Sequence, residues 1–131
     1  MKKVALLLGL VLLVGCLDLE EEISGRWEGV YQMSSESDQH KLVFLLNQDA
    51  DHLAGSVILD DWSMPIETGI ITGSNIEVTA KYDIKISGSS YNFSGQLEED
   101  QIIGKVSAHH YAFTDGSNEQ GKLELTHVSS G

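Results

Sequence analysis

The stretch FLLNQDADHLAGSV, residues 44–57, decides the fold, because its pattern returns 49 residues later as FSGQLEEDQIIGKV, residues 93–106. In both copies apolar residues alternate with polar ones, and a short acidic segment separates the two alternating halves. Alternation with period two is typical of a strand with one buried face, and a polar break of this length indicates a tight turn. A fainter third copy covers residues 69–78. Three similar hairpins in series predict an antiparallel up-and-down meander.

The same pattern extends over most of the chain. From Ile23 onward, alternating segments are separated by clusters of Gly, Asn, Asp and Ser, and no window has the period of an amphipathic helix. The only proline, Pro65, fits the start of a strand, where a missing N–H is tolerated. Segment 114–121 predicts a polar loop before the last strand. The predicted strands are residues 25–33, 40–48, 52–59, 65–72, 75–83, 90–98, 101–112 and 121–128.

We therefore expect an all-β domain, a single antiparallel meander of about eight strands that closes into a small barrel, because closure removes exposed strand edges. An eight-stranded barrel is either filled by its own side chains or holds one small ligand, and the sequence leaves both states open. If a ligand binds, the aromatic interior residues are the candidate contacts, namely Trp27, Tyr31, Phe44, Tyr91 and Phe93. Alternation assigns to the interior Trp27, Gly29, Tyr31, Met33, Phe44, Leu46, Leu53, Gly55, Val57, Ile76, Val78, Tyr91, Phe93, Leu97, Ile102, Val106, Leu123 and Leu125.

The first predicted strand carries a short motif, Gly25-Arg26-Trp27, followed by Gly29 and Tyr31. Together with about eight short strands and the Leu-x-Gly turns, this motif resembles the calycin group, which comprises lipocalin-like and avidin-like barrels. The resemblance covers residues 24–128 and implies that Trp27 closes one end of the barrel. The lipocalin signatures of later strands and the avidin-type set of biotin-contacting residues are not evident. The resemblance therefore implies an architecture and no particular ligand.

The N-terminus has the order of an export signal. Met1-Lys2-Lys3 is positive, and the apolar run 4–14 is too short to cross a bilayer core of roughly 30 Å. The run ends in Leu13-Val14-Gly15-Cys16, which resembles the lipobox of bacterial lipoproteins. That resemblance implies cleavage before Cys16, a diacylglycerol group on its thiol and an N-acyl lipid on the new amine, which together anchor stably. Since Leu17 rather than Asp follows Cys16, it also implies the periplasmic face of the outer membrane if the source is Gram-negative.

These motifs divide the chain into three parts. Residues 1–15 are predicted to be a signal peptide that is removed, 16–23 the lipidated cysteine and an acidic tether, and 24–131 the barrel domain. Removing residues 1–15 takes away Lys2 and Lys3 and no acid, so the formal net charge moves from −12 to −14. Such a charge excludes nucleic acid and docking on anionic lipid through a basic patch, whereas a basic protein partner fits it.

No combination of residues indicates catalysis or a resident metal. His109 and His110 are adjacent and on a strand point to opposite faces, while His110 and His127 could meet across the last hairpin. Two histidines are too few for a zinc site. The acidic segments 60–61 and 98–100 fall at predicted turns, where solvated acids are common. We expect no catalytic residue, no metal, and no cofactor other than the lipid on Cys16.

Three functions remain after these exclusions. The first is a non-enzymatic envelope lipoprotein that binds a small apolar ligand or a lipid inside the barrel. The second is an acidic protein-interaction module, such as an envelope assembly factor or an inhibitor of a basic enzyme like lysozyme. The third is a purely structural surface protein. An internal cavity would favour the first, and a rigid loop rich in acids and aromatic rings would favour the second.

Overall fold

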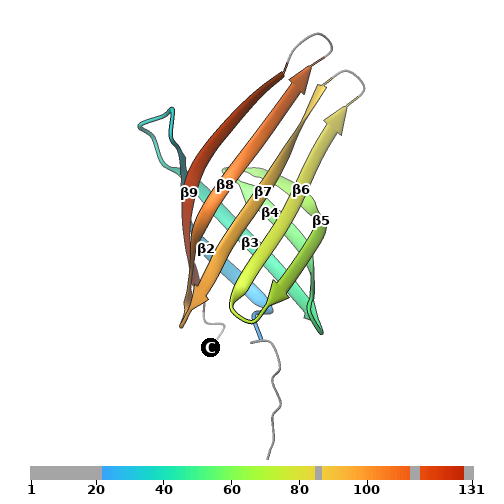
Figure 1. Cartoon of the computed structure of the whole chain (residues 1–131), viewed down its shortest axis with the longest axis vertical. Coiled ribbons are helices and arrows are strands. Elements are labelled where there is room, and N and C mark those ends of the chain that lie inside the picture. Colours follow the sequence, from blue (N-terminus) through green and yellow to red (C-terminus); the bar gives the residue numbers. More distant parts are fainter. Residues whose placement is uncertain (1–21, 85–86, 113–115, 129–131) are drawn as a thin grey trace, which may run out of the picture.

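The computed structural model describes residues 22–84, 87–112 and 116–128. Each strand pairs antiparallel with the next, and the last pairs with the first, so the sheet is a closed eight-stranded barrel (Figure 1). The all-β meander predicted from the sequence is confirmed. No helix in the described ranges is long and apolar enough to cross a membrane. The strands are β2 (Gly25–Met33), β3 (His40–Asp49), β4 (His52–Leu59), β5 (Trp62–Thr72), β6 (Asn75–Ile84), β7 (Ser87–Glu98), β8 (Gln101–Ala112) and β9 (Gly116–His127).

The sequence repeat is a structural repeat. Phe44 pairs with Val57 in the β3–β4 hairpin, and the corresponding residues of the second copy pair in the same way in β7–β8. Both hairpins turn through two residues, and the first of these, Ala50 or Glu99, has a φ of 58° or 60°. A left-handed first residue lets a tight turn follow the right-handed twist of the strands. The predicted equivalence of the two hairpins is confirmed in register.

Three strands begin earlier than predicted. β5 begins at Trp62 rather than 65, β7 at Ser87 rather than 90, and β9 at Gly116 rather than 121. The predicted loop over 114–121 is therefore wrong from Gly116 onward, and its first two residues lie outside the described ranges. The early strand residues are mostly Ser, Gly and Asn, which favour turns in isolation. Pairing with β4 for the start of β5, with β6 and β8 for the start of β7, and with β8 for the start of β9 overrides that local preference.

Pro65 lies inside β5 and not at its start, so that prediction was also wrong. It is opposite Ser56, and the register between β4 and β5 shifts by one residue just beyond this pair. A second shift, between Ile66 and Thr68, interrupts the pairing of β5 with β6. Bulges of this kind leave backbone groups out of the ladder, so a residue without an N–H is tolerated there.

The interior predicted from alternation is confirmed. Every apolar side chain assigned to the interior is buried, apart from Tyr91 and Leu97, which are partly buried and pack against the core. At mid-height Phe44 and Phe93 meet edge to face with ring centroids 5.2 Å apart. This arrangement is favourable for aromatic pairs. The structure adds to the core Ile23, Leu42, Leu59, Met64, Ile71, Ala80 and Ala108.

One end of the barrel is closed by Ile23, whose side chain is only 1% exposed. The backbone N–H of Ile23 donates to Oε1 of Gln48 (2.8 Å), and the Ile23 carbonyl accepts from Nε1 of Trp27 (3.0 Å). The ring of His127 packs against Trp27 with centroids 4.7 Å apart. Ile23 thus belongs to the barrel floor, one residue before the predicted start of the domain. The first and last described residues both lie at this end (Figure 1).

The interior glycines serve close approach between strands. A Cβ on Gly29 would overlap the carbonyl oxygen of Glu124 on β9, and a Cβ on Gly104 would overlap that of Ser94 on β7. The space next to these glycines is occupied by backbone and not by a cavity. Glycine is therefore required there because neighbouring strands coil tightly around the barrel.

We expect Trp27→Ala to unfold or nearly unfold the domain. Trp27 is 2% exposed, and truncating a buried tryptophan typically costs about 3–5 kcal/mol, a large share of the stability of a small domain. Trp62, 54% exposed, provides the matched control, and Trp62→Ala should cost little. Urea titration of the two variants measures the difference. A Trp27→Ala protein as stable as wild type would contradict the packing described above.

Candidate functional site

The described residues form a pocket of about 210 Å³ toward the end of the barrel opposite Ile23. Five strands contribute its walls, because alternation turns every second side chain of each strand inward. A two-residue turn, Asp60 and Asp61, joins β4 to β5 at the rim. The pocket is lined by Tyr31, Leu59, Asp60, Trp62, Met64, Tyr82, Ser89 and Tyr91.

Four of the eight residues that line the pocket are aromatic. Trp62 and Tyr82 meet edge to face with centroids 4.6 Å apart, while Tyr31 and Tyr91 come from β2 and β7. Tyr91 in turn stacks on Phe93, with centroids 6.2 Å apart, which connects the pocket floor to the filled core. Trp62 is more than half exposed although it lies in this cluster. Large exposed aromatic side chains beside a pocket are typical of binding surfaces.

A histidine held by two carboxylates braces one side of the rim. His40 contacts Oε1 of Glu36 through Nε2 (2.7 Å) and Oδ2 of Asp60 through Nδ1 (2.9 Å). Its ring stacks on Tyr31 with centroids 5.1 Å apart. The bond to Glu36, together with the bond to Asp60, raises the pKa of His40 above its usual value, against the opposing effect of burial. The contacts hold the β2–β3 connection against the β4–β5 turn.

A second histidine, His110, braces β7, β8 and β9 at the same end of the barrel. Nδ1 of His110 lies 2.8 Å from Oγ of Ser89, and its Nε2 lies 3.0 Å from Oε2 of Glu119. Its ring meets Tyr91 edge to face, with centroids 5.8 Å apart. The chain of contacts connects β7, β8 and β9 above the pocket.

The order Ser89, His110, Glu119 resembles a serine-hydrolase triad, and the geometry argues against that chemistry. In a triad the acid holds Nδ1 and the nucleophile faces Nε2, whereas here the two ring nitrogens are exchanged. Acyl transfer also needs free backbone N–H groups to stabilise the oxyanion. Ser89 lies in β7, where it pairs with Tyr82 of β6 on one side and with His110 of β8 on the other. Its backbone therefore belongs to the ladder.

The pocket environment disfavours negative charge. Burial, followed by the neighbouring Tyr91 and the carboxylates of Asp60, Glu36 and Glu119, raises the pKa of Tyr31 well above its usual value. Burial likewise raises the pKa of Tyr91, to which Glu119 contributes. Both hydroxyls therefore stay protonated across the physiological range and can donate or accept hydrogen bonds.

The structure separates the five predicted ligand contacts into two groups. Tyr31 and Tyr91 line the pocket, whereas Trp27, Phe44 and Phe93 are 1–2% exposed within the filled part of the barrel.

The interior predicted from alternation lacks two of the aromatic wall residues, Trp62 and Tyr82. Tyr82 continues the inward parity of Ile76, Val78 and Ala80, so the alternation itself was a signal for it. Trp62 was missed because the strand that carries it was predicted to start three residues later.

His110 and His127 do not meet across the last hairpin, although the sequence left that contact open. His110 pairs with Ser117 near the mouth, while His127 pairs with Trp27 at the closed end. The register of the last hairpin therefore places His110 beside the start of β9, whereas His127 is the last residue of β9. His109 does point outward, where it contacts Asn118 (2.6 Å). Within the described ranges, no three His, Cys, Asp or Glu side chains lie close enough to hold a metal ion.

The predicted acidic turns are confirmed as turns, and they lie at opposite ends of the barrel. Residues 60–61 lie at the mouth, whereas residues 99–100 lie at the closed end. They therefore cannot face each other across one cleft, as paired catalytic carboxylates must.

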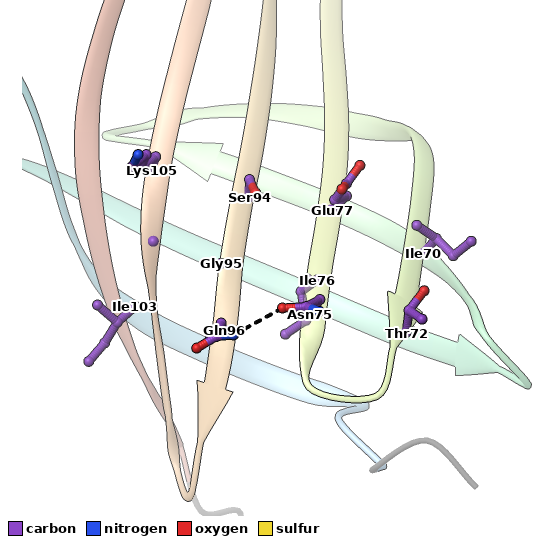
Figure 2. Close-up of a pocket in the computed structure, with 11 residues that line it drawn as sticks. Ile70, Thr72, Asn75, Ile76, Glu77, Ser94, Gly95, Gln96, Ile103 and Lys105 are labelled. Atoms are coloured by element: carbon purple, nitrogen blue, oxygen red, sulfur yellow. Dashed lines mark hydrogen bonds between the residues drawn. The ribbon is translucent and has the colours of Figure 1, made fainter. Parts of the chain in front are cut away.

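A larger hollow of about 430 Å³ lies on the outer surface of β5 to β8 (Figure 2). Nε2 of Gln96 donates to Oδ1 of Asn75 across it (3.1 Å), and Ile70 and Ile103 stand at its edges. No aromatic ring is among the described residues that line it. Ligand sites combine apolar walls with a few convergent polar groups, and the mouth pocket fits that description better.

Solved structures share this architecture at low sequence identity. Apo bradavidin2 matches with a TM-score of 0.53 at 11% identity, over 77% of this chain and 96% of its own. The rhizavidin–biotin complex gives 0.52 at 13%, over 85% and 99%, and apo shwanavidin gives 0.52 at 17%, over 81% and 99%. No protein-family model and no curated protein sequence matches the chain. The likeness shows an avidin-like eight-stranded barrel fold.

We expect Glu36→Gln to lower the pKa of His40, because it weakens the contact that contributes most to the raised value. A pKa that is raised in the folded state stabilises the fold below the unfolded value, about 6.5, and this contribution is lost as pH rises through the folded-state pKa. The variant should therefore lower the urea midpoint more at about pH 5.5 than at about pH 8.5. Titration of the His40 ring proton by NMR measures the shift directly. Asp38→Asn, in the same connection, is the control and should leave that titration unchanged.

Proposed function

We propose that this chain is a non-enzymatic, lipid-anchored binding protein of the bacterial cell envelope that holds a small molecule in the mouth of its avidin-like barrel. The observation that supports the proposal most directly is the pocket between Tyr31, Trp62, Tyr82 and Tyr91. These rings converge from four strands around a space that the described side chains leave unfilled. The hydroxyls of the tyrosines and of Ser89 supply the few polar groups that orient a ligand.

The size of the pocket limits the ligand. About 210 Å³ is less than the roughly 300–1,000 Å³ of sites for drug-sized molecules. Below it, Phe44, Val57 and Phe93 fill the barrel and are at most 2% exposed. A long acyl chain would find no channel between these side chains. The proposed ligand is therefore a compact molecule and not a whole lipid.

Structures with the same fold support binding within the barrel. Bradavidin2 and rhizavidin have both been solved in complex with biotin. The carboxylates around the mouth, Glu36, Asp60 and Glu119, make it unfavourable for a ligand with its own carboxylate. These structures therefore support binding within the barrel, but the proposed ligand is not biotin.

The lipid anchor is proposed from the motif that ends in Cys16, and such an anchor would orient the barrel on the membrane. The described part of the chain begins next to Ile23, in the floor of the barrel. A tether from Cys16 would join the barrel at the end opposite the pocket, so the mouth would face away from the membrane. If the source is Gram-negative, the absence of Asp after Cys16 favours the periplasmic face of the outer membrane.

We expect Cys16→Ala to abolish lipid attachment, because Cys16 is the only cysteine and thioether formation needs its thiol. Cells fed radioactive palmitate should label the wild-type chain and not the variant. Cell fractionation should then find the variant outside the membrane pellet. Equal label on both proteins would refute the lipid anchor and leave the ligand pocket untouched.

We expect Ser89→Phe to block ligand binding by filling the mouth pocket. Ser94→Phe is the matched control, because it makes the same change on the same strand within the outer hollow of Figure 2. Both changes are introduced into the full chain carrying Cys16→Ser, which is purified without detergent. Native mass spectrometry should find a co-purified small molecule on the parent and on Ser94→Phe.

Ser89→Phe should carry none while melting within a few degrees of its parent. Retention of the small molecule by Ser89→Phe would place the site elsewhere. Its absence from all three proteins, with none of the probes named below bound, would refute ligand binding.

A further inference from the structure

We infer that the ligand of the mouth pocket is a small organic cation, a quaternary or protonated amine enclosed by aromatic rings beside the carboxylate of Asp60. The inference rests on the proposed ligand-binding function and adds the chemical class of the ligand. Three properties of the pocket support it: the aromatic wall, the neighbouring carboxylates and the small volume.

The wall chemistry suits a cation. The faces of aromatic rings carry partial negative charge, and a cation within about 6 Å of a ring centroid is attracted to it. Trp62, Tyr82, Tyr31 and Tyr91 all line the same 210 Å³ space. Trp62 offers the strongest such interaction among side chains, and its exposure leaves it accessible to a ligand.

The charges around the pocket have the matching sign. Asp60 lines it, and Glu36 and Glu119 stand at its rim. His40 balances part of this charge, because it lies between two of the three carboxylates. No Lys or Arg is among the described residues that line the pocket. A cation therefore meets an excess of negative charge on entry, and the surplus of acids over the whole chain would steer it there.

The uncharged part of the wall defines the shape of the cation. Leu59 and Met64 present apolar surface within the same pocket. A bare metal ion or a strongly hydrated primary amine gains little from such contacts. A methylated ammonium carries its charge beneath an apolar surface, so it can contact both the rings and the aliphatic side chains while losing little hydration. Its head group is compact enough for the pocket.

Choline and its neutral analogue, in which carbon replaces the nitrogen, test the inference because they share one shape. Each is titrated into the purified full chain carrying Cys16→Ser and followed by calorimetry and by Trp emission. Choline should bind at least about tenfold more tightly than the neutral analogue, since desolvated cation–ring contacts are lost without the charge. Biotin, an anion, should bind more weakly than either.

Asp60→Asn then tests the charge at the pocket. Asn tolerates the left-handed backbone of this residue, whose φ is 56°. Because the Asp60 side chain is 55% exposed, the expected weakening of choline binding is about two- to fivefold. Asp51→Asn makes the same change of net charge in a turn at the closed end and should leave choline binding unchanged.

The outcomes separate this inference from the proposed function. Equal affinity for choline and the neutral analogue would overturn the cation, as would no binding of choline at all. In either case a small molecule that is lost on Ser89→Phe would still support ligand binding at the mouth. If Asp60→Asn and Asp51→Asn weakened choline binding equally, the net charge of the chain would explain the effect. That result would overturn the assignment of Asp60 as the carboxylate beside the cation.

Discussion

The pairing of β2 with β9 is the interaction on which the rest of the structure depends. It runs from Trp27 opposite His127 to Met33 opposite Gly121, and it converts an open meander into a barrel without edges. Gly29 lies in this seam because a side chain there would collide with the backbone of β9. Closure gives the sheet one enclosed face, and that face collects most of the apolar side chains of the described strands.

Closure also makes the two ends of the barrel different. At one end Ile23 folds beneath Trp27 and seals the interior. At the other end the strands are unequal in length, since β7, β8 and β9 have 12 residues and β4 has 8. The longer hairpins extend beyond the shorter ones (Figure 1). The aromatic rings at this height line a pocket, whereas the apolar side chains below them pack into a filled core.

The polar groups of the mouth have a structural role that is compatible with binding. Two histidines, His40 and His110, each join carboxylates or hydroxyls from separate strands, so the rim is fixed before any ligand arrives. A preorganised rim reduces the ordering cost of binding. Because the carboxylates outnumber the histidines that they contact, the rim retains a negative excess, which is the basis for the proposed selectivity toward cations.

The sequence by itself determined the strands, their inward faces, the repeated hairpins and the burial of Trp27. These follow from alternation and turn chemistry, which act between residues close in the chain. Only the tertiary structure decided that the barrel is filled below and open above, and that Trp62 meets Tyr82 and Ser89 meets His110. The physical reason is that such contacts depend on register, bulges and strand length around the closed sheet, which no local pattern encodes.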